Sequence, residues 1–182
     1  MTPQTPSRRT IVKGAAWSAP VVTIAAAAPS LAASPDPTPP HDLSTSVPGT
    51  GVRQSATNLN LSPTTFNNTG SESIEGLTIT FVVDNGQTIT GITIFDKDIK
   101  DLVAGATTSG YGSDTVVLTL PPNTNGGVGQ VSIAPGGSYK APLGQDIGLS
   151  SPSAFTISVT VKASNELAGD VPYTSTNPVP AA

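Results

Sequence analysis

The stretch Phe155-Thr156-Ile157-Ser158-Val159-Thr160-Val161-Lys162 alternates apolar and polar residues along its whole length. In an extended chain successive side chains point to opposite faces, so every second residue from Phe155 to Val161 would share one face. β-Branched residues dominate both faces, which favours a pleated surface and disfavours a helix. The pattern predicts a β-strand that is buried on one side only.

The same alternation occurs in residues 77–83, where one face would carry Leu77, Ile79, Phe81 and Val83. Asp84-Asn85-Gly86 follows, and Asn-Gly tolerates the positive φ angles of tight turns. Residues 87–95 are therefore predicted to fold back antiparallel onto this strand. Gly91 lies where the apolar spacing changes between Ile89 and Ile92, which predicts a β-bulge.

Further short apolar runs are separated by turn residues. They comprise residues 58–61, 115–120 and 130–133, and Pro135-Gly136-Gly137-Ser138 is a typical turn sequence. Helical periodicity is absent from this part of the sequence. Residues 44–175 are therefore predicted to form an all-β fold, a single antiparallel β-sandwich of about seven to nine strands.

The order of four short motifs resembles that of bacterial immunoglobulin-like domains on secreted and surface proteins. These motifs are Asn68-Thr69-Gly70, Gly76-Leu77-Thr78-Ile79-Thr80-Phe81, Ala134-Pro135-Gly136-Gly137-Ser138 and Thr156-Ile157-Ser158-Val159-Thr160-Val161. The resemblance implies an immunoglobulin-like sandwich with a role outside the cytoplasm. Residues 139–153 are longer than the turn expected in this pattern, so the strand order stays open.

The run Ser7-Arg8-Arg9-Thr10-Ile11-Val12-Lys13 places paired arginines ahead of two aliphatic residues and a lysine. It resembles the twin-arginine signal of bacterial export substrates. With its continuation through Val22, it is also similar to signals of secreted proteins from actinobacteria. The resemblance implies that Ser7, Arg8, Arg9, Ile11, Val12 and Lys13 address the chain to the twin-arginine export machinery. A secreted or cell-surface location is then expected.

Residues 14–31 are rich in alanine and are interrupted by Pro20 and Pro29. A membrane-spanning helix needs about 20 predominantly apolar residues, so no permanent membrane span is expected. Small residues at Ser30, Ala32 and Ala33 predict cleavage by signal peptidase after Ala32, or alternatively after Ala33. Residues 1–32 are thus predicted to be a signal peptide. The alternative, a chance arginine pair before a buried helix, is opposed by the two prolines.

Two segments flanking the sandwich are predicted to lack regular structure. Residues 33–43 include Ser34-Pro35-Asp36-Pro37-Thr38-Pro39-Pro40-His41, a proline-rich run that favours an extended spacer. Residues 176–182 contain Pro178 and Pro180 and are predicted to be a disordered tail.

The composition of the chain argues against several kinds of site and partner. The chain of 182 residues has no cysteine, so neither a disulfide nor a thiolate metal site can form. Removing residues 1–32 takes away three basic residues and no acidic one, which leaves 5 basic and 12 acidic residues, a formal net charge of −7. Such acidity repels phosphate backbones, so nucleic acid is not an expected partner.

Few residues of the sequence are candidates for catalysis, metal binding or ligand recognition. His41 is the only histidine, and a spacer is not expected to hold it against a nucleophile, so no Ser-His-Asp triad is predicted. Asp96, Asp98 and Asp101 could offer carboxylates to a calcium ion; they lack EF-hand spacing, and a charged loop is the alternative. Tyr111, in a glycine-rich loop, could recognise a ligand or pack over the end of the sandwich. No cofactor is indicated.

These observations favour an exported, non-enzymatic module for adhesion, wall interaction or surface assembly, with a cell-wall or surface protein as its partner. The alternative is a small secreted calcium-dependent carbohydrate-binding domain or hydrolase that uses the three aspartates. Sites that stack sugar rings are usually lined by aromatic residues, and the chain after residue 32 has no tryptophan and only seven Phe and Tyr residues.

Overall fold

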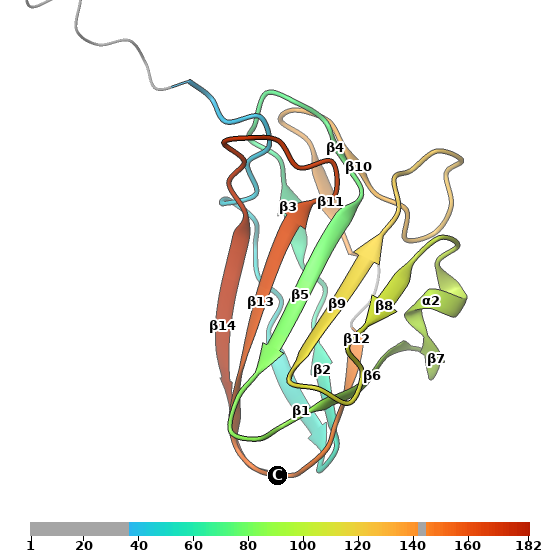
Figure 1. The fold of residues 1–182 in the computed structure, drawn as a ribbon, viewed down its shortest axis with the longest axis vertical. Coiled ribbons are helices and arrows are strands. Elements are labelled where there is room, and N and C mark those ends of the chain that lie inside the picture. The colour runs from blue at the N-terminus through green and yellow to red at the C-terminus, as the bar shows by residue number, and fades with distance from the viewer. Residues whose placement is uncertain (1–36, 142–144) are drawn as a thin grey trace, which may run out of the picture. The chain divides into compact units, whose positions relative to one another are not determined.

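The computed structural model describes residues 37–141 and 145–182, and strands dominate it (Figure 1). In chain order the strands are β1 (Gly51–Ser55), β2 (Asn58–Leu61), β3 (Thr65–Asn67), β4 (Ile74–Glu75), β5 (Leu77–Val83), β6 (Ile89–Ile94), β7 (Lys97–Asp98), β8 (Thr107–Ser109), β9 (Thr115–Leu120), β10 (Ser132–Ile133), β11 (Ser138–Lys140), β12 (Gln145–Leu149), β13 (Phe155–Ala163) and β14 (Tyr173–Val179). A four-residue helix, α2 (Ile99–Leu102), connects β7 to β8. The predicted signal peptide, and residues 33–36 of the predicted spacer, lie outside the described residues.

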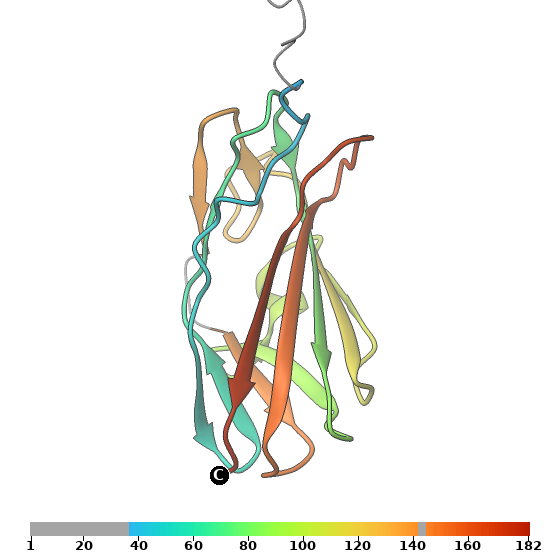
Figure 2. The same cartoon turned by 90° about the vertical axis from the view of Figure 1, so that its left-hand side faces the viewer.

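Two five-stranded sheets form the layers of the sandwich. One sheet has the order β14-β13-β5-β9-β8 and the other the order β1-β2-β12-β6-β7. Figure 2 shows the sheets face to face, with β1 and β2 opposite β14 and β13. Two short pairs, β10 with β4 and β11 with β3, extend one end. All strand pairs in these sheets are antiparallel. The predicted antiparallel immunoglobulin-like sandwich is confirmed.

The alternation in the sequence decides which side chains form the core. Along β5 every second residue, from Leu77 to Val83, is buried. β13 shows the same pattern at Phe155, Ile157 and Val161. The strand assignments exceed seven to nine because they include pieces of two or three residues, which are too short to show an alternation in sequence.

The predicted hairpin between residues 77–83 and 87–95 is wrong. β5 pairs with β13 and β9, whereas β6 pairs with β12 and β7 in the opposite sheet. The turn has the expected positive φ at Asn85 and Gly86, yet it carries the chain across the sandwich. Gln87 is buried after this turn, and its side-chain oxygen accepts hydrogen bonds at 2.8 Å from the Ser150 hydroxyl and from the Ser151 N–H. These bonds tie the start of β6 to the segment that follows β12.

The predicted β-bulge in this strand is confirmed. Gly148 of β12 lies opposite Gly91 and the next residue, Leu149, lies opposite Ile89, so Thr90 is the extra residue. A Cβ on Gly148 would lie 2.4 Å from the Thr90 hydroxyl oxygen. Glycine at position 148 therefore leaves room for the bulged residue.

Both ends of the sandwich extend beyond their predicted limits. β14 continues to Val179, so residues 176–179 are strand rather than disordered tail. Leu43 is buried, and its N–H donates to the Val171 carbonyl at 2.9 Å, which places the end of the 33–43 spacer inside the domain. The sequence of β14 concealed this strand because its apolar residues, Tyr173 and Val179, lie at its two ends. Pro178 is compatible with pairing there because β14 is an edge strand.

Helical structure is minor throughout the described ranges. None of their helices is long and apolar enough to cross a membrane. The predictions for residues 14–31 lie outside those ranges.

Candidate functional site

His41 is anchored to the end of the sandwich, so the predicted spacer packs on the domain at this residue. Its side chain is 1% exposed. Nδ1 lies 2.8 Å from Asp170 Oδ2, and the His41 backbone N–H donates to Asp170 Oδ1 at 3.0 Å. Nε2 lies 3.2 Å from the Ser73 carbonyl oxygen, which also accepts a hydrogen bond from Asn165 Nδ2 at 2.9 Å. His41 therefore connects three segments that are distant in sequence.

Asp170 supplies the charge in this cluster. Burial acts to raise its pKa, but hydrogen bonds from the Leu167 N–H and from His41, together with the charge of His41, outweigh burial and hold the pKa below its ordinary value. The carboxylate is consequently ionised at neutral pH. Nδ1 faces the Asp170 carboxylate, Nε2 faces a backbone carbonyl and the ring is buried, so neither nitrogen is placed to take a proton from a nucleophile. We interpret the cluster as an anchor for the start of the domain.

The three aspartates considered for calcium do not form a ligand set. Asp96 is exposed in the turn after β6, and Asp101 is exposed on α2. Asp98 caps α2: its Oδ1 accepts the Lys100 N–H at 3.1 Å and its Oδ2 lies 3.5 Å from Lys100 Nζ. Within residues 37–141 and 145–182, no group of three or more His, Cys, Asp or Glu side chains is placed to hold a metal ion.

Tyr111 packs over the sandwich, as one of its two interpretations predicted. Its ring is half-buried against the core, and its hydroxyl accepts the Ile92 N–H at 3.1 Å. It therefore has a structural partner for its polar end and does not stand free on its loop.

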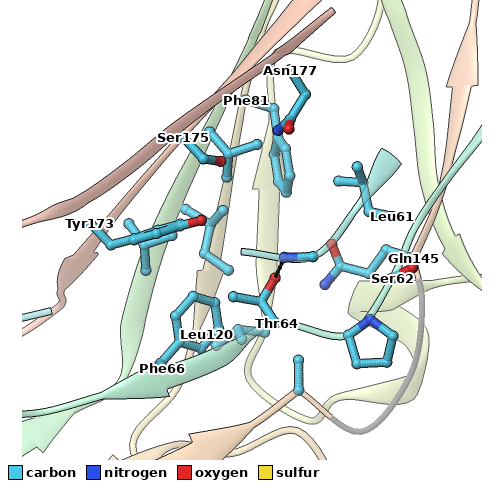
Figure 3. Close-up of a pocket in the computed structure, with 16 residues that line it drawn as sticks. Leu61, Ser62, Thr64, Phe66, Phe81, Leu120, Gln145, Tyr173, Ser175 and Asn177 are labelled. Carbon is cyan, nitrogen blue, oxygen red and sulfur yellow. Dashed lines mark hydrogen bonds between the residues drawn. The ribbon is translucent and has the colours of Figure 1, made fainter. Parts of the chain in front are cut away.

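A small hollow opens between the sheets beside β14 (Figure 3). Phe66 and Phe81 contribute apolar surface, Ser175 and Asn177 contribute polar groups, and the volume is about 50 Å³. The Tyr173 hydroxyl points toward this space in Figure 3 and is buried without a hydrogen-bond partner among the described residues. A volume of this size suits a few water molecules. We therefore interpret this hollow as a gap in the packing between the sheets and not as a binding site for a larger molecule.

A strained turn joins β6 to β7 and displays an aromatic ring. Phe95 and Asp96 have φ angles of 51° and 60°, in the left-handed region that non-glycine residues rarely adopt. Phe95 is also 74% exposed, the highest exposure, shared with Val128, among the large apolar residues described. Two unfavourable features thus coincide at one residue.

An apolar hollow lies beside this turn. We call it the Phe95 hollow, and its main walls are Phe95, Ile99, Leu102, Val103, Val128 and Tyr139. Its volume is about 270 Å³, close to the lower end of the range for ligand pockets. Leu102 and Val128 are exposed at 36% and 74%. Burial raises the pKa of Tyr139, so its phenol is neutral at physiological pH.

Gly129 permits the close approach that shapes one wall of this hollow. Its φ is 77°, and a Cβ there would lie only 2.4 Å from Val103 Cγ2. The loop before β10 can therefore pack directly on Val103, and Val128 is placed at the wall of the Phe95 hollow as a result.

A second, shallower hollow begins at the same aromatic residue. We call it the acidic hollow; it has a volume of about 440 Å³ and is lined by Asn60, Ser62, Pro63, Ile94, Phe95, Asp96 and Asp146. Asp146 Oδ1 accepts a hydrogen bond from Asn60 Nδ2 at 2.8 Å, which fixes that carboxylate at the surface of β12. Phe95 and Ile94 line both hollows, so an apolar and an acidic surface meet there.

Sequence reasoning missed Phe95, which it placed at the end of a return strand. A signal was present, because Ile92 and Ile94 point inward in an alternating strand, and the next residue must then point outward. The hollow itself had no signal, since α2, the loop before β10 and β11 meet only in the folded chain.

The comparisons with known proteins give no family. No family model and no curated protein sequence matches the chain. Among solved structures, it resembles the collagen-binding domain of a Staphylococcus aureus adhesin, with 13% identity and a TM-score of 0.39 over 71% of this chain and 93% of that one. It also resembles the seventh ScaB type I cohesin from Pseudobacteroides cellulosolvens, with 12% identity and a TM-score of 0.41 over 78% and 93%.

A similar likeness exists to part of an enzyme. The chain resembles 19% of the exo-β-N-acetylglucosaminidase of Vibrio harveyi, with 17% identity and a TM-score of 0.33 over 79% of this chain. These likenesses are loose, and they assign no ligand, partner or activity to the protein.

Proposed function

We propose that the protein is an exported, non-enzymatic binding module that acts at or outside the cell envelope and contacts its partner through the Phe95 hollow. The observation that carries this proposal is an exposed aromatic ring, held in a strained backbone conformation, at the edge of an apolar hollow. Such a surface is typical of a binding site for another molecule.

The energetics of Phe95 support a role outside the domain itself. A left-handed conformation costs about 1–2 kcal/mol for an L-residue with a Cβ. Exposure at 74% means that most of the ring does not contribute burial energy to folding. A small polar residue would suit the turn better. The aromatic ring is therefore better explained by contact with a partner than by the stability of the domain.

The sequence supports export. In this proposal the twin-arginine machinery recognises Ser7–Lys13, and signal peptidase cleaves after Ala32 or Ala33. The mature chain then carries a net charge of −7 and is secreted or held at the cell surface by a wall component or a surface protein. The folded domain would provide the binding surface, in adhesion or in surface assembly.

Export is tested by intact mass measurements on protein from medium, wall and cytoplasm. Wild type should yield a species that begins at Ala33 or Ser34 outside the cytoplasm. The double variant Arg8→Lys, Arg9→Lys should accumulate with its full-length mass in the cytoplasm. Equal processing of both proteins would contradict the proposed signal.

Binding is tested by photo-crosslinking on intact cells. Benzoylphenylalanine at position 95 keeps an aromatic ring at the turn, and the same group at position 82 is a matched control, because Val82 is 40% exposed on β5. A discrete adduct should form from position 95 and not from position 82. Adducts of equal yield at both positions, or no adduct at either position, would contradict the proposal that the Phe95 hollow is the binding site.

A further inference from the structure

We infer that the partner segment is an extended peptide in which one residue separates an apolar side chain from a lysine or arginine. The apolar side chain enters the Phe95 hollow and the cation lies in the acidic hollow. This inference rests on the proposed function and specifies the chemistry of its partner.

The shape and chemistry of the Phe95 hollow indicate the apolar group. Its walls are aliphatic and aromatic, with Tyr139 and Gln145 as polar exceptions, and about 270 Å³ accommodates a side chain such as leucine or phenylalanine. A sugar ring would leave most of its hydroxyl groups without hydrogen-bond partners there, at a desolvation cost for each. An apolar side chain leaves no polar group unpaired.

Charge complementarity indicates the cation. Asp96 and Asp146 line the acidic hollow, and no basic side chain is among the described residues that line it. Lys97 is next to Asp96 in the turn and weakens the local field, whereas Lys100 lies 3.5 Å from the Asp98 carboxylate. The charge of −7 on the chain after residue 32 adds long-range attraction for a basic segment. The same charge disfavours an anionic membrane surface as the occupant.

The position of Phe95 between the two hollows sets the spacing. In an extended peptide, residues i and i+2 point to the same side and lie about 7 Å apart. Two such side chains can straddle one aromatic ring, and the cation can also contact the exposed ring. Adjacent residues would point to opposite sides, so the i, i+2 arrangement is the one that reaches both hollows.

The test uses four synthetic peptides and the full-length chain. The reference is acetyl-Gly-Ser-Gly-Leu-Ser-Lys-Gly-Ser-Gly-amide, and its matched versions replace Lys by Gln, Lys by Glu, or Leu by Ser. Amide chemical shifts of the isotope-labelled protein report binding up to millimolar Kd. The Lys peptide should bind at least threefold more tightly than the Gln peptide and at least tenfold more tightly than the Glu peptide. The Ser-for-Leu peptide should not bind measurably.

Protein variants assign these differences to the two hollows. Asp96→Asn with Asp146→Asn should reduce the preference for Lys over Gln to less than twofold, and asparagine suits the positive φ of position 96. Phe95→Ser should abolish binding of the three peptides that contain leucine. Asp101→Asn, an exposed carboxylate outside both hollows, is the control and should leave every Kd unchanged.

The outcomes separate this inference from the proposed function. Binding that requires Phe95 but shows equal affinity for the Lys, Gln and Glu peptides would refute the inference that the partner is cationic. The Phe95 hollow would still be a binding site. Absence of binding by every peptide, with a position-95 crosslink still formed on cells, would overturn the peptide chemistry alone. A missing crosslink would instead remove the proposed site.

Discussion

Replacing Asp170 by asparagine tests the anchor that holds the start of the domain. Asp170 Oδ2 lies 2.8 Å from both His41 Nδ1 and the Leu167 N–H, and Oδ1 accepts the His41 backbone N–H. Asparagine replaces one carboxylate oxygen by an NH₂ group and removes the negative charge, so it cannot satisfy all three of these contacts. Asp170→Asn is therefore expected to destabilise the domain without altering the Phe95 hollow or the acidic hollow.

The magnitude follows from the loss of one or two of these bonds. A hydrogen bond to a charged group contributes about 1.5–3 kcal/mol, and the Asp170 side chain is only 10% exposed. Reorientation of His41 and entry of water would recover part of this loss. We expect the free energy of unfolding to fall by about 2–4 kcal/mol at pH 7, a substantial fraction of the total stability of a small domain.

The pH dependence gives a second, independent check. The pKa of Asp170 is lower in the folded state than its ordinary value of 3.8. Its carboxylate therefore contributes stability that is complete above the unfolded-state pKa and is lost as the pH falls through the folded-state pKa. The difference between wild type and Asp170→Asn should shrink as the pH falls below about 4, from the linkage relation.

Urea unfolding followed by circular dichroism measures these differences. Asp101→Asn is the control, because its carboxylate is exposed and its replacement should change stability by less than about 0.5 kcal/mol. A loss below about 1 kcal/mol for Asp170→Asn at pH 7 would refute the magnitude derived from these charged bonds. A loss that stays constant down to pH 3 would refute the role of the ionised carboxylate.

Three further substitutions make separate predictions. Tyr173→Phe should leave stability unchanged or raise it by up to about 1 kcal/mol, because the removed hydroxyl has no partner among the described residues; a loss above that amount in urea unfolding would mean that the hydroxyl is satisfied. Phe95→Asn should raise the free energy of unfolding by about 0.5–1 kcal/mol through relief of backbone strain and should abolish peptide binding; reduced stability would show that the ring supports the fold. Gly129→Ala should cost about 1–3 kcal/mol, since its Cβ would meet Val103 and its φ is positive; a neutral effect in the same assay would show that the loop relaxes freely.

The sequence predicted the two central strands well because burial leaves a period of two in any strand with one solvent face. β5 and β13 both show that period, and their inward residues were identified correctly. Val159 has the same inward position in β13, yet it is only half-buried and lines the hollow beside β14. Alternation therefore predicts which face points inward and does not predict how fully that face is covered.

The partner of a strand was harder to predict than the strand. Asn85-Gly86 specified the turn conformation, but the same conformation can close a hairpin or carry the chain to the opposite sheet. The chain crosses to the opposite sheet at Gln87, whose side chain bonds to Ser150 and Ser151, more than 60 residues later in the chain. A local pattern contains no information on such a contact.

His41 was misplaced for a related reason. A proline-rich run favours an extended backbone, and that prediction is compatible with a segment packed on the sandwich as well as with a free spacer. The decisive contacts come from Asp170 and Ser73, which approach His41 only after folding. An extended segment was therefore predictable from composition, and its burial was not.

Phe95 shows where local preference and the folded structure disagree. Elsewhere in the described chain, Asn85 and a series of glycines occupy the left-handed positions, as their conformational freedom favours. Phe95 and Asp96 depart from that rule, and Phe95 combines the departure with high exposure. Conflicts of this kind are expected mainly at functional sites, because selection for stability alone would remove them. The coincidence of strain, exposure and two adjoining hollows at one residue is therefore the strongest physical argument that this turn is built for contact with a partner.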